Sequence, residues 1–267
     1  MNIYLYFRMM AILFTHHWYT YRLRISTYLI NYGLFYPIVL TISFGYLQPR
    51  TYFNDTTGTL GLVLIAGVLL IMLASLSGDM AYAFLHDKST KGYVYYLQSI
   101  FPYFIIYLSY IVFATCWVSA VISLFFIVSW GTFSLFSTGT VQSIQITKLF
   151  IAIILSSCTW VCYHYLASVV LNSVHQISPF WVRITMPLQM LGGMFTPWAI
   201  MYAVSPYLGY LALCTPFIYV TEGLRAALLG ESYFLNYSLC MITLTIICFI
   251  LICVGLHRFK KQIDCVV

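Results

Sequence analysis

The most regular feature of the chain is a succession of long apolar stretches separated by short polar ones. Six of them approach or exceed the roughly 20 mostly apolar residues that a helix needs to cross the hydrocarbon core of a bilayer. They cover residues 27–47, 58–83, 103–130, 146–171, 184–203 and 235–256. Alternating strands of about 10 residues, which would indicate a membrane barrel, are not found in the sequence. The pattern therefore predicts an all-α integral membrane protein with six transmembrane helices.

The composition also indicates that the protein is surrounded by lipid. Hydrophobic residues make up 62% of the 267 positions and charged residues only 7%, whereas a soluble domain carries about a quarter charged residues. The mean hydropathy of +0.93 leaves too little polar side chain to cover a surface that faces water. Because no long polar segment interrupts the pattern, we expect a single transmembrane domain over 1–267, with the six spans inside 27–256.

The lysines and arginines near the span ends predict which side of the membrane each loop faces, because cytoplasmic loops carry an excess of both. With the N-terminus in the cytoplasm, nine of these residues fall on the inner side and three on the outer side. The inner set is Arg8, Arg22, Arg24, Lys88, Lys91, Arg183, Arg258, Lys260 and Lys261, and the outer set is Arg50, Lys148 and Arg225. Both termini, including a tail over 257–267, are therefore expected in the cytoplasm. The net charge of +6 follows from this topology, and a nucleic acid is not an expected partner.

The first 26 residues form a separate element. Their apolar part is too short to span a membrane, is interrupted by Arg8 and is followed by further basic residues. This pattern predicts a helix that lies in the cytoplasmic interface of the membrane over 1–26. The adjacent His16 and His17 do not predict a metal site, because neighbouring helix positions point about 100° apart and no third ligand is nearby in the sequence.

The most charged internal segment follows the second predicted span. It contains Asp87, Lys88, Lys91, Gly92 and Leu97. The charged part is followed by a short amphipathic run that ends before Pro102, which is typical of a short helix lying across the mouth of two spans. An ordinary cytoplasmic loop with a positive charge excess is the alternative interpretation, and the composition alone favours it.

The segment between the fifth and sixth predicted spans is apolar but contains Pro206 and Pro216, so it cannot form one straight span. Thr215 can cap a helix that starts at Pro216, and Gly230 can end it. A re-entrant hairpin of short helices that dips into the outer leaflet fits this pattern, provided that protein buries its broken backbone.

Glu222 and Arg225 stand three residues apart in this hairpin and can pair on one helix face. A charge at membrane depth is a functional hypothesis by default. An ion pair that only holds the hairpin together is the alternative interpretation, and the sequence favours it slightly.

Two segments of this region resemble a known family. The run T-P-F-I-Y-V-T-E-G-L-R over 215–225 resembles the N-P-x-x-Y-x-x-E-x-x-R signature of ABC-2 type transporter permeases, with Thr215 in place of Asn. The run G-G-M-F-T-P over 192–197 resembles the G-x-F-x-P element that this family places in its fifth span. The segment 87–99 resembles the family's cytoplasmic E-x-x-x-G-T-x-x-x-L segment, although K-G-Y replaces the usual Gly-Thr pair.

The resemblance covers essentially the whole chain and implies the membrane subunit of an ABC exporter in a bacterial plasma (inner) membrane. Two copies would form the pathway, and separate ABC ATP-binding subunits would bind ATP. The implied coupling residues are Asp87, Lys88, Lys91, Gly92 and Leu97. The chain has no G-x-x-x-x-G-K-[ST] phosphate loop, so we expect neither a cofactor nor enzyme activity in this chain itself.

By the same resemblance, the outer hairpin forms a gate and the second and fifth spans line the pathway. The implied gate residues are Pro216, Tyr219, Glu222 and Arg225, and Asp79 is expected at the cytoplasmic mouth. An interfacial pairing of Asp79 with Lys88 or Arg183 is equally compatible with the sequence. The expected lining is uncharged and rich in aromatic residues (Tyr82, Met194, Phe195, Tyr202), which suits a lipid-linked, glycolipid or hydrophobic drug-like cargo.

An ion channel or secondary transporter that works without an ATPase is the alternative function. No Asp, Glu, Lys or Arg falls in the middle of a predicted span, which argues against proton or sodium coupling. A membrane-embedded enzyme is a further alternative. His164 is the only histidine in the middle of a predicted span, and no catalytic grouping accompanies it, so we expect it to be a packing residue.

Overall fold

The computed structural model describes residues 3–47, 59–90, 101–136, 145–171, 173–231 and 234–264, and all regular structure in these ranges is helical. Five stretches are long and apolar enough to cross a membrane. They are Ser26–Leu47, Gly61–His86, Tyr103–Leu135, Ile146–Val170 and Tyr237–Gln262. The chain is therefore a multi-pass, all-α membrane protein, as the hydrophobic pattern predicts. The number of candidate spans rises to six if the bent pair Pro206–Leu213 and Pro216–Leu229 counts as one span.

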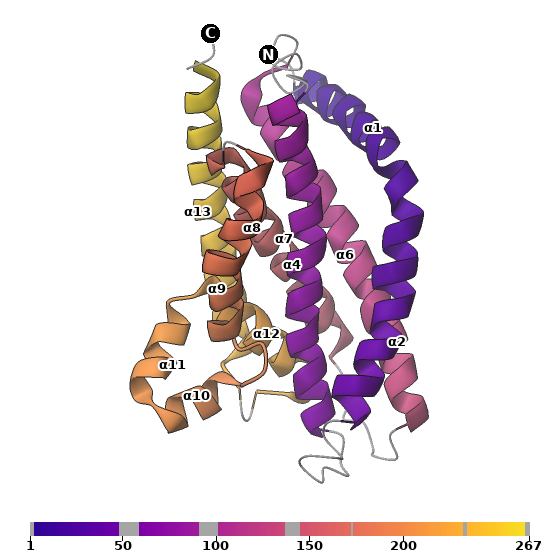
Figure 1. Cartoon of the computed structure of the whole chain (residues 1–267), viewed down its shortest axis with the longest axis vertical. Helices are drawn as coiled ribbons and strands as arrows, with labels where there is room; N and C mark the ends of the chain where they lie inside the picture. Colours follow the sequence, from indigo (N-terminus) through magenta and orange to yellow (C-terminus); the bar gives the residue numbers. More distant parts are fainter. Residues whose placement is uncertain are drawn as a thin grey trace.

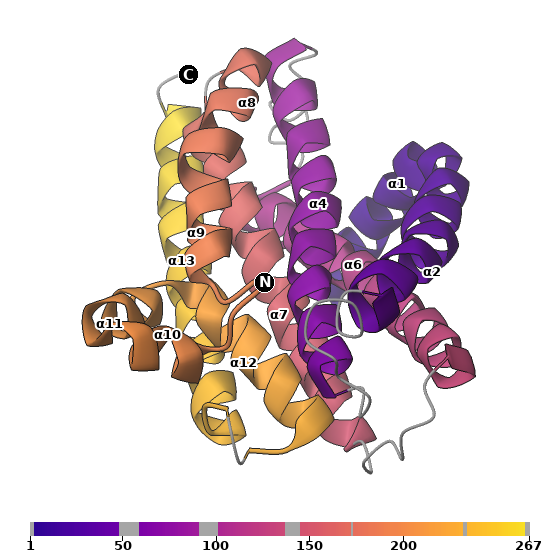
Figure 2. The ribbon, with the colours of Figure 1, turned by 60° about the horizontal axis from the view of Figure 1, so that its bottom comes forward.

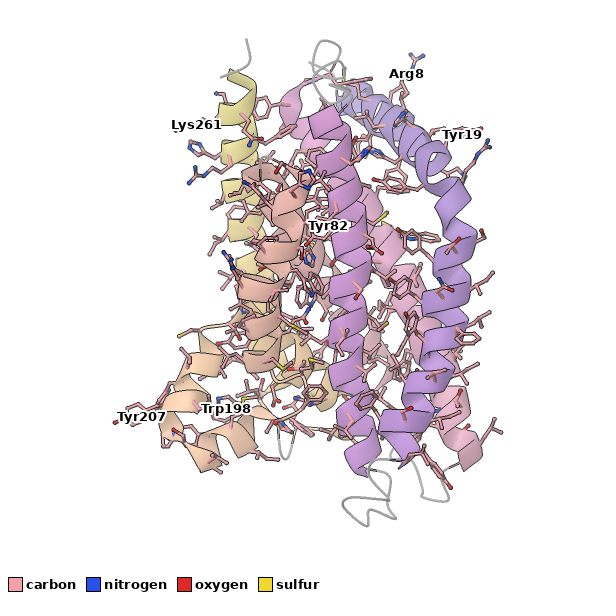
Figure 3. The ribbon with its side chains drawn as sticks, in the orientation of Figure 1. Arg8, Tyr19, Tyr82, Trp198, Tyr207 and Lys261 are labelled. Carbon is pink, nitrogen blue, oxygen red and sulfur yellow. The ribbon has the colours of Figure 1, made fainter. Side chains whose placement is uncertain are left out.

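Four long helices form the bundle, and both ends of the chain lie at the same end of it (Figure 1). These helices are α4 (Thr59–Thr90), α6 (Tyr103–Phe136), α7 (Ile146–Val170) and α13 (Tyr237–Asp264). We call the end that holds both termini the terminal end, and the opposite end the distal end. Arg8 and Lys261 lie at the terminal end, whereas Trp198 and Tyr207 lie towards the distal end (Figure 3).

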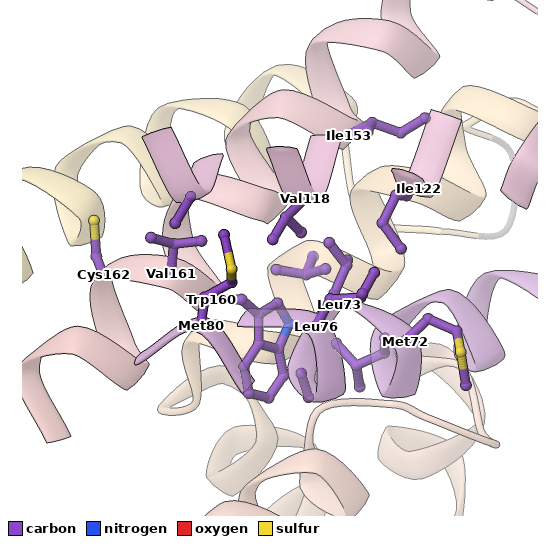
Figure 4. Packing of buried hydrophobic residues seen from close by; sticks show 14 of the residues in the cluster. Met72, Leu73, Leu76, Met80, Val118, Ile122, Ile153, Trp160, Val161 and Cys162 are labelled. Carbon is purple, nitrogen blue, oxygen red and sulfur yellow. The ribbon is translucent and has the colours of Figure 1, made fainter. Parts of the chain in front are cut away.

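The core is built around α7, which contacts α4, α6, α13 and the shorter α12 (Pro216–Leu229). Trp160 of α7 has no exposed surface, and its indole stacks on the ring of Phe217 with centroids 3.8 Å apart. Figure 4 shows this indole beside Met80 and Leu76 of α4, with Val118 and Ile122 of α6 nearby. Burial of this apolar surface in the bundle interior brings the helices together.

Residues 3–47 form one continuous helical run rather than two separate elements. It consists of α1 (Ile3–Tyr28), the π-helical η1 (Leu29–Phe35), α2 (Tyr36–Leu40) and the π-helical η2 (Thr41–Leu47). Figure 1 shows that α1 is inclined relative to the part that follows. The predicted elements over 1–26 and 27–47 therefore join without a break in the helix.

The predicted continuous span over 184–203 is wrong. A helical run made of α8 (Ile177–Phe180), η4 (Trp181–Thr185) and α9 (Met186–Leu191) ends before Gly192. Gly193 then adopts a positive φ of 77°, and α10 (Trp198–Val204) begins only after Pro197. The two glycines and the proline end the helix, although their neighbours keep the stretch apolar.

In the broken segment that follows, only α12 has the predicted helix bounds, from Pro216 to the residue before Gly230. Helix α11 (Pro206–Leu213) starts at one proline and α12 at the other, their axes differ by 96°, and α12 ends at Gly230 with a positive φ of 88°. Thr215 occupies the N-cap position of α12, but its hydroxyl donates to the carbonyl oxygen of Ala212 instead of capping the helix. Helices α10 and α11 project from the side of the bundle in both views (Figures 1 and 2).

Candidate functional site

The candidate site is the ion pair on α12. Arg225 donates from Nη1 to Oε1 of Glu222 at 3.1 Å, and neither side chain has any exposed surface. The pair lies near the distal end, because Arg225 also donates from Nε to the carbonyl oxygen of Val63 at 3.4 Å. Val63 is two residues inside the candidate span Gly61–His86. The predicted i, i+3 pairing is confirmed.

The guanidinium of Arg225 connects three separate parts of the chain. Besides its bonds to Glu222 and Val63, it donates from Nη2 to the carbonyl oxygen of Gly193 at 2.6 Å. Its rigid, planar fork of three nitrogens holds acceptors at several fixed directions at once. One side chain thereby ties α4, α12 and the turn after α9 to one another.

The carboxylate of Glu222 satisfies two backbone groups that would otherwise lack partners. Oε1 accepts the N–H of Trp198 at 3.1 Å, and Oε2 accepts the N–H of Leu235 at 3.2 Å. Trp198 is the first residue of α10, whose N–H has no acceptor within its own helix. Leu235 lies just before α13. Glu222 therefore fixes both the start of α10, the first of the two projecting helices, and the segment that leads into α13.

The G-G-M-F-T-P turn over 192–197 packs directly on this ion pair. Thr221 donates to the carbonyl oxygen of Gly192 at 2.7 Å. A Cβ at Gly193 would lie 2.9 Å from the hydroxyl of Thr221 and 3.3 Å from Nη1 of Arg225, so only glycine fits there. On the other side of the turn, a Cβ at Gly67 of α4 would overlap the carbonyl oxygen of Met194.

The structure thus joins two motif segments that the sequence presents separately. The segments 192–197 and 215–225 form one buried unit in which every charged atom of the pair has a hydrogen-bond partner. A buried pair with this geometry balances its desolvation cost only while both partners are present. In this conformation the two charges are closed off from solvent, which favours the structural interpretation of the pair.

The other two predicted gate residues lie at the start of α12. Pro216 is the first residue of the helix, where its missing N–H costs nothing. Tyr219 is partly buried and donates its hydroxyl to the carbonyl oxygen of Leu213 at 2.9 Å. Tyr219 therefore closes the turn between α11 and α12.

Asp79 faces the first span. Its Oδ2 atom lies 3.5 Å from the hydroxyl of Tyr32, whose ring packs between those of Tyr28 and Tyr36 at 5.9 and 5.4 Å. Among the side chains that the structure describes, Arg183 makes no ion pair, and the side chain of Lys88, the other alternative partner of Asp79, lies outside the described residues. The interfacial pairing of Asp79 therefore stays a prediction. The role of Asp79 at a pathway mouth stays a prediction.

The predicted coupling residues lie largely outside the described part of the chain. Helix α4 continues to Thr90, so Asp87 and Lys88 belong to its last turn rather than to a loop. Their side chains, and all of Lys91, Gly92 and Leu97, fall outside the described residues. The coupling assignment therefore stays a prediction.

His164 connects α7 to α4 in a way that the sequence does not indicate. Its Nδ1 lies 2.9 Å from Oγ of Ser77, and its ring stacks between the indoles of Trp160 and Trp181 at 5.3 and 5.9 Å. It is fully buried, and this environment agrees with a packing role. No signal in the sequence pairs it with Ser77, which lies 87 positions earlier.

The histidines of α1 are also part of the packing. His17 is buried, its Nε2 lies 3.2 Å from Oγ of Ser109, and its ring packs on Tyr110 with centroids 4.1 Å apart. These contacts hold α1 against α6. Among the described residues, no group of three or more His, Cys, Asp or Glu side chains could hold a metal ion.

No protein-family model matches this chain, and no curated protein matches it either.

Proposed function

We propose that this chain is the membrane subunit of an ATP-driven exporter of the ABC-2 type. It works as a dimer with a separate ATP-binding subunit. The observation that carries the proposal is the buried unit made by the segments 192–197 and 215–225. Both segments resemble family motifs, and the contacts between Gly193 and Arg225 give these motifs a common physical reason.

In this proposal the chain crosses the membrane six times. The helical run Ile177–Leu191 with the following turn and α10 makes the fifth crossing, and α11 and α12 form the re-entrant outer hairpin. The terminal end is cytoplasmic and the distal end is outside, as the excess of basic residues suggests. The host membrane is a bacterial plasma membrane.

In this mechanism, α4 transmits movement from the terminal end to the distal end. This helix has 32 residues without a break, so it extends about 48 Å from the terminal end to the distal end. ATP-driven closure of the partner subunits pushes on the end of α4 at Asp87 and Lys88 and on the segment with Lys91, Gly92 and Leu97. The displacement reaches Val63 at the other end of the helix, where Arg225 is bonded to the backbone.

The hairpin responds because Glu222 and Arg225 link it to α4. A shift of α4 strains the bonds of Arg225 to Val63 and Gly193, and a rearrangement of these bonds moves α10 through the contact of Trp198 with Glu222. The pair is thus a structural joint that transmits the gate movement between two states. The cargo is a lipid-linked, glycolipid or hydrophobic drug-like molecule.

Affinity purification of the tagged chain from its native membranes, followed by mass spectrometry, tests this proposal. We expect a stoichiometric, separately encoded subunit that bears an ATP-binding phosphate loop. A homo-oligomer without any ATPase would contradict the exporter assignment and support an ion channel or a secondary transporter. Purification of the chain from cells that were treated with a crosslinker before detergent was added controls for the loss of a weakly bound subunit.

A further inference from the structure

Arg183 lies much deeper in the bundle than its place in the sequence suggests. It belongs to η4, in the middle of the helical run Ile177–Leu191. The preceding Trp181 lies beside α4, since its Cζ3 atom is 3.7 Å from the position of a Cβ on Gly78. Further along the chain, Met194 packs on Gly67, so the run descends along α4 towards the distal end.

These contacts give the depth of Arg183. Gly78 lies eight residues before His86, the terminal end of its candidate span, which corresponds to about 12 Å along the helix. Arg183 is two residues beyond Trp181 in the distal direction, about 3 Å deeper. The resulting depth is about 15 Å from the terminal end of a candidate span of 26 residues, which is about 39 Å long. Because the hydrocarbon core is about 30 Å thick, this span extends about 4–5 Å beyond the core at each end. The backbone of Arg183 is therefore placed about 10 Å inside the core, on the terminal side of its midplane.

The guanidinium of Arg183 has no compensating partner in the chain as described. It is exposed, and among the described side chains it forms no ion pair or hydrogen bond. A charged side chain at this depth costs several kcal/mol when it faces lipid, so such residues face a polar cavity or a partner of opposite charge. The exposed face of the run Ile177–Leu191 is therefore not simply a lipid-facing surface.

The surroundings of Arg183 define the chemistry of its partner. The run is attached to the bundle through a narrow stripe that includes the buried Thr185 and Gln189. The rest of its surface is exposed or partly exposed and, apart from Ser178 and Arg183, apolar. The exposed apolar side chains on either side of Arg183 are Val182, Ile184, Met186 and Met190. A single cation within an apolar surface is complementary to an amphiphile that combines an anionic group with a hydrophobic part.

We propose that Arg183 binds the phosphate of an anionic lipid-like substrate that moves along the exposed face of Ile177–Leu191. A guanidinium makes two parallel charge-assisted hydrogen bonds to a phosphate, which fixes its orientation. The apolar neighbours contact the hydrophobic part of the same molecule. This inference rests on the proposed transport function and narrows its cargo from any hydrophobic molecule to a phosphate-bearing amphiphile.

The geometry of the helix supports uptake from the terminal end. Side chains of an α-helix tilt towards its N-terminus, and the N-terminus of this run lies at the terminal end. The guanidinium is therefore directed towards the side from which an exporter would load its cargo. The same tilt brings the guanidinium closer to the headgroup region of the terminal end, although the backbone of Arg183 lies within the hydrocarbon core.

Lipid retention by the purified full-length chain tests the proposal without an ATPase. The chain is equilibrated in mixed micelles of phosphatidylglycerol and phosphatidylcholine, and the lipids retained are measured by native mass spectrometry. We expect the wild type to prefer phosphatidylglycerol, and Arg183→Gln to lose about tenfold of this preference, as for a lost charged hydrogen bond. Arg183→Lys should retain part of it. Arg258→Gln, at an exposed cation of α13, is the matched control and should retain all of it.

An equal preference in wild type and Arg183→Gln would overturn the proposal. So would dissociation of an oligomer by Arg183→Gln without a change in lipid preference, because it would assign Arg183 to a carboxylate of a second copy. If Arg183→Gln fails to insert, the preference for phosphatidylglycerol is compared between the wild type and Arg183→Lys instead. A reduced preference in Arg183→Lys supports the proposal, and an unchanged one contradicts it. A retained preference in a chain that captures no ATPase would leave the phosphate site intact and contradict only the exporter assignment.

Thiol labelling gives an independent readout of the environment. In Arg183→Cys, a water-soluble, anionic methanethiosulfonate should react at position 183, as identified by peptide mass spectrometry. The native Cys116 and Cys253, exposed on α6 and α13, are the internal controls for surfaces that face lipid. Labelling at position 183 no faster than at these two cysteines would show a lipid-facing residue and contradict the proposal.

Discussion

The guanidinium of Arg225 lies 2.6 Å from the carbonyl oxygen of Gly193, a residue 32 positions earlier in the chain. This bond is possible because Gly193 has a positive φ, which turns the backbone of 192–197 towards α12. The left-handed turn and the buried cation therefore depend on each other. A change in either residue should affect the same structural unit.

Removal of one partner of the buried pair should destabilise the protein strongly. We expect Arg225→Ala to cost about 3–5 kcal/mol, because it leaves the carboxylate of Glu222 buried with an unpaired charge. The double variant Glu222→Met with Arg225→Leu should recover part of this loss, since apolar residues of similar volume remove both charges. Thermal unfolding in detergent, followed by fluorescence-detected gel filtration, measures both.

The exposed ion pair between Lys148 and Glu231 provides the control for this experiment. Its atoms are 3.3 Å apart, but both side chains are partly exposed. Lys148→Ala should therefore cost less than about 1 kcal/mol. An effect of Arg225→Ala as small as that of Lys148→Ala would contradict the structural role of the buried pair.

The close approach of α4 to the 192–197 turn predicts that Gly67 tolerates no side chain. In Gly67→Ala the new methyl group would overlap the carbonyl oxygen of Met194, and backbone cannot move aside as a flexible side chain can. We expect a loss of about 1–3 kcal/mol or more in unfolding free energy. Gly131→Ala in α6 is the matched control, because no atom lies within 4 Å of its added Cβ. It should be neutral or slightly stabilising, since alanine favours a helix over glycine.

The contact between α1 and α6 should weaken in acid. Burial, together with a smaller effect of the neighbouring His16, lowers the pKa of His17 from 6.5 to about 3. The docked state therefore holds a neutral His17, and its stability is complete above pH 6.5. It declines below pH 6.5, because the released or unfolded state then binds a proton that the docked state excludes until about pH 3.

Hydrogen exchange of α1 amides, corrected for the intrinsic effect of pH, measures this weakening. Between pH 7.5 and pH 5.5 we expect the opening free energy to fall by about 1.4 kcal/mol, one pKa unit of linkage. The variant His17→Phe cannot titrate and should lose this part of the pH dependence. Identical pH profiles for the wild type and this variant would exclude His17 as the responsible group.

The proposed orientation predicts a labelling pattern. A membrane-impermeant maleimide applied to intact cells should react with Thr56→Cys and Gly139→Cys, which fall in predicted outer loops. It should not react with Lys91→Cys, in a predicted cytoplasmic segment, until the membrane is opened. The unmodified chain, with its eight native cysteines, gives the background. The reverse labelling pattern would show that the chain has the opposite orientation in the membrane.

Coupling to the partner subunit predicts a specific defect. Asp87→Ala and Gly92→Ala should leave insertion and the basal ATPase rate of the complex unchanged but reduce export per ATP hydrolysed. The reason is that the family resemblance implies an ATPase contact for both positions. Reconstituted complexes with a simultaneous ATPase and transport assay measure the ratio, and wild-type ratios in both variants would exclude this surface as the coupling site.

Local chemistry made the breaks at the two prolines predictable from the sequence. Pro206, Pro216 and Gly230 act through backbone geometry within their own few residues, so the start of α11 and both ends of α12 follow directly. The pairing of Glu222 with Arg225 is also local, since one helical turn brings them together. The five long spans follow from hydrophobicity summed over about 20 residues, which a single substitution hardly changes.

The sequence could not reveal features that depend on distant parts of the chain. The partners of Arg225 at Val63 and Gly193 are backbone carbonyls, which carry no residue-specific signal. The average hydropathy over 184–203 concealed the break at Gly192 and Gly193. For the same reason Arg183 was expected outside the membrane. Only the contact of Trp181 with Gly78 reveals its depth.

The helical continuity of residues 3–47 constrains the length of the N-terminal part of the protein. Both π-helical segments, η1 and η2, lie between α1 and the distal end of the first span. Each residue added to or removed from this run turns everything before it by about 100° around the helix axis. Leu13 and Tyr21 would then leave their buried positions. The number of residues in this run therefore sets the rotation of α1 about its own axis. An insertion or deletion in the run is consequently far more disruptive than a substitution.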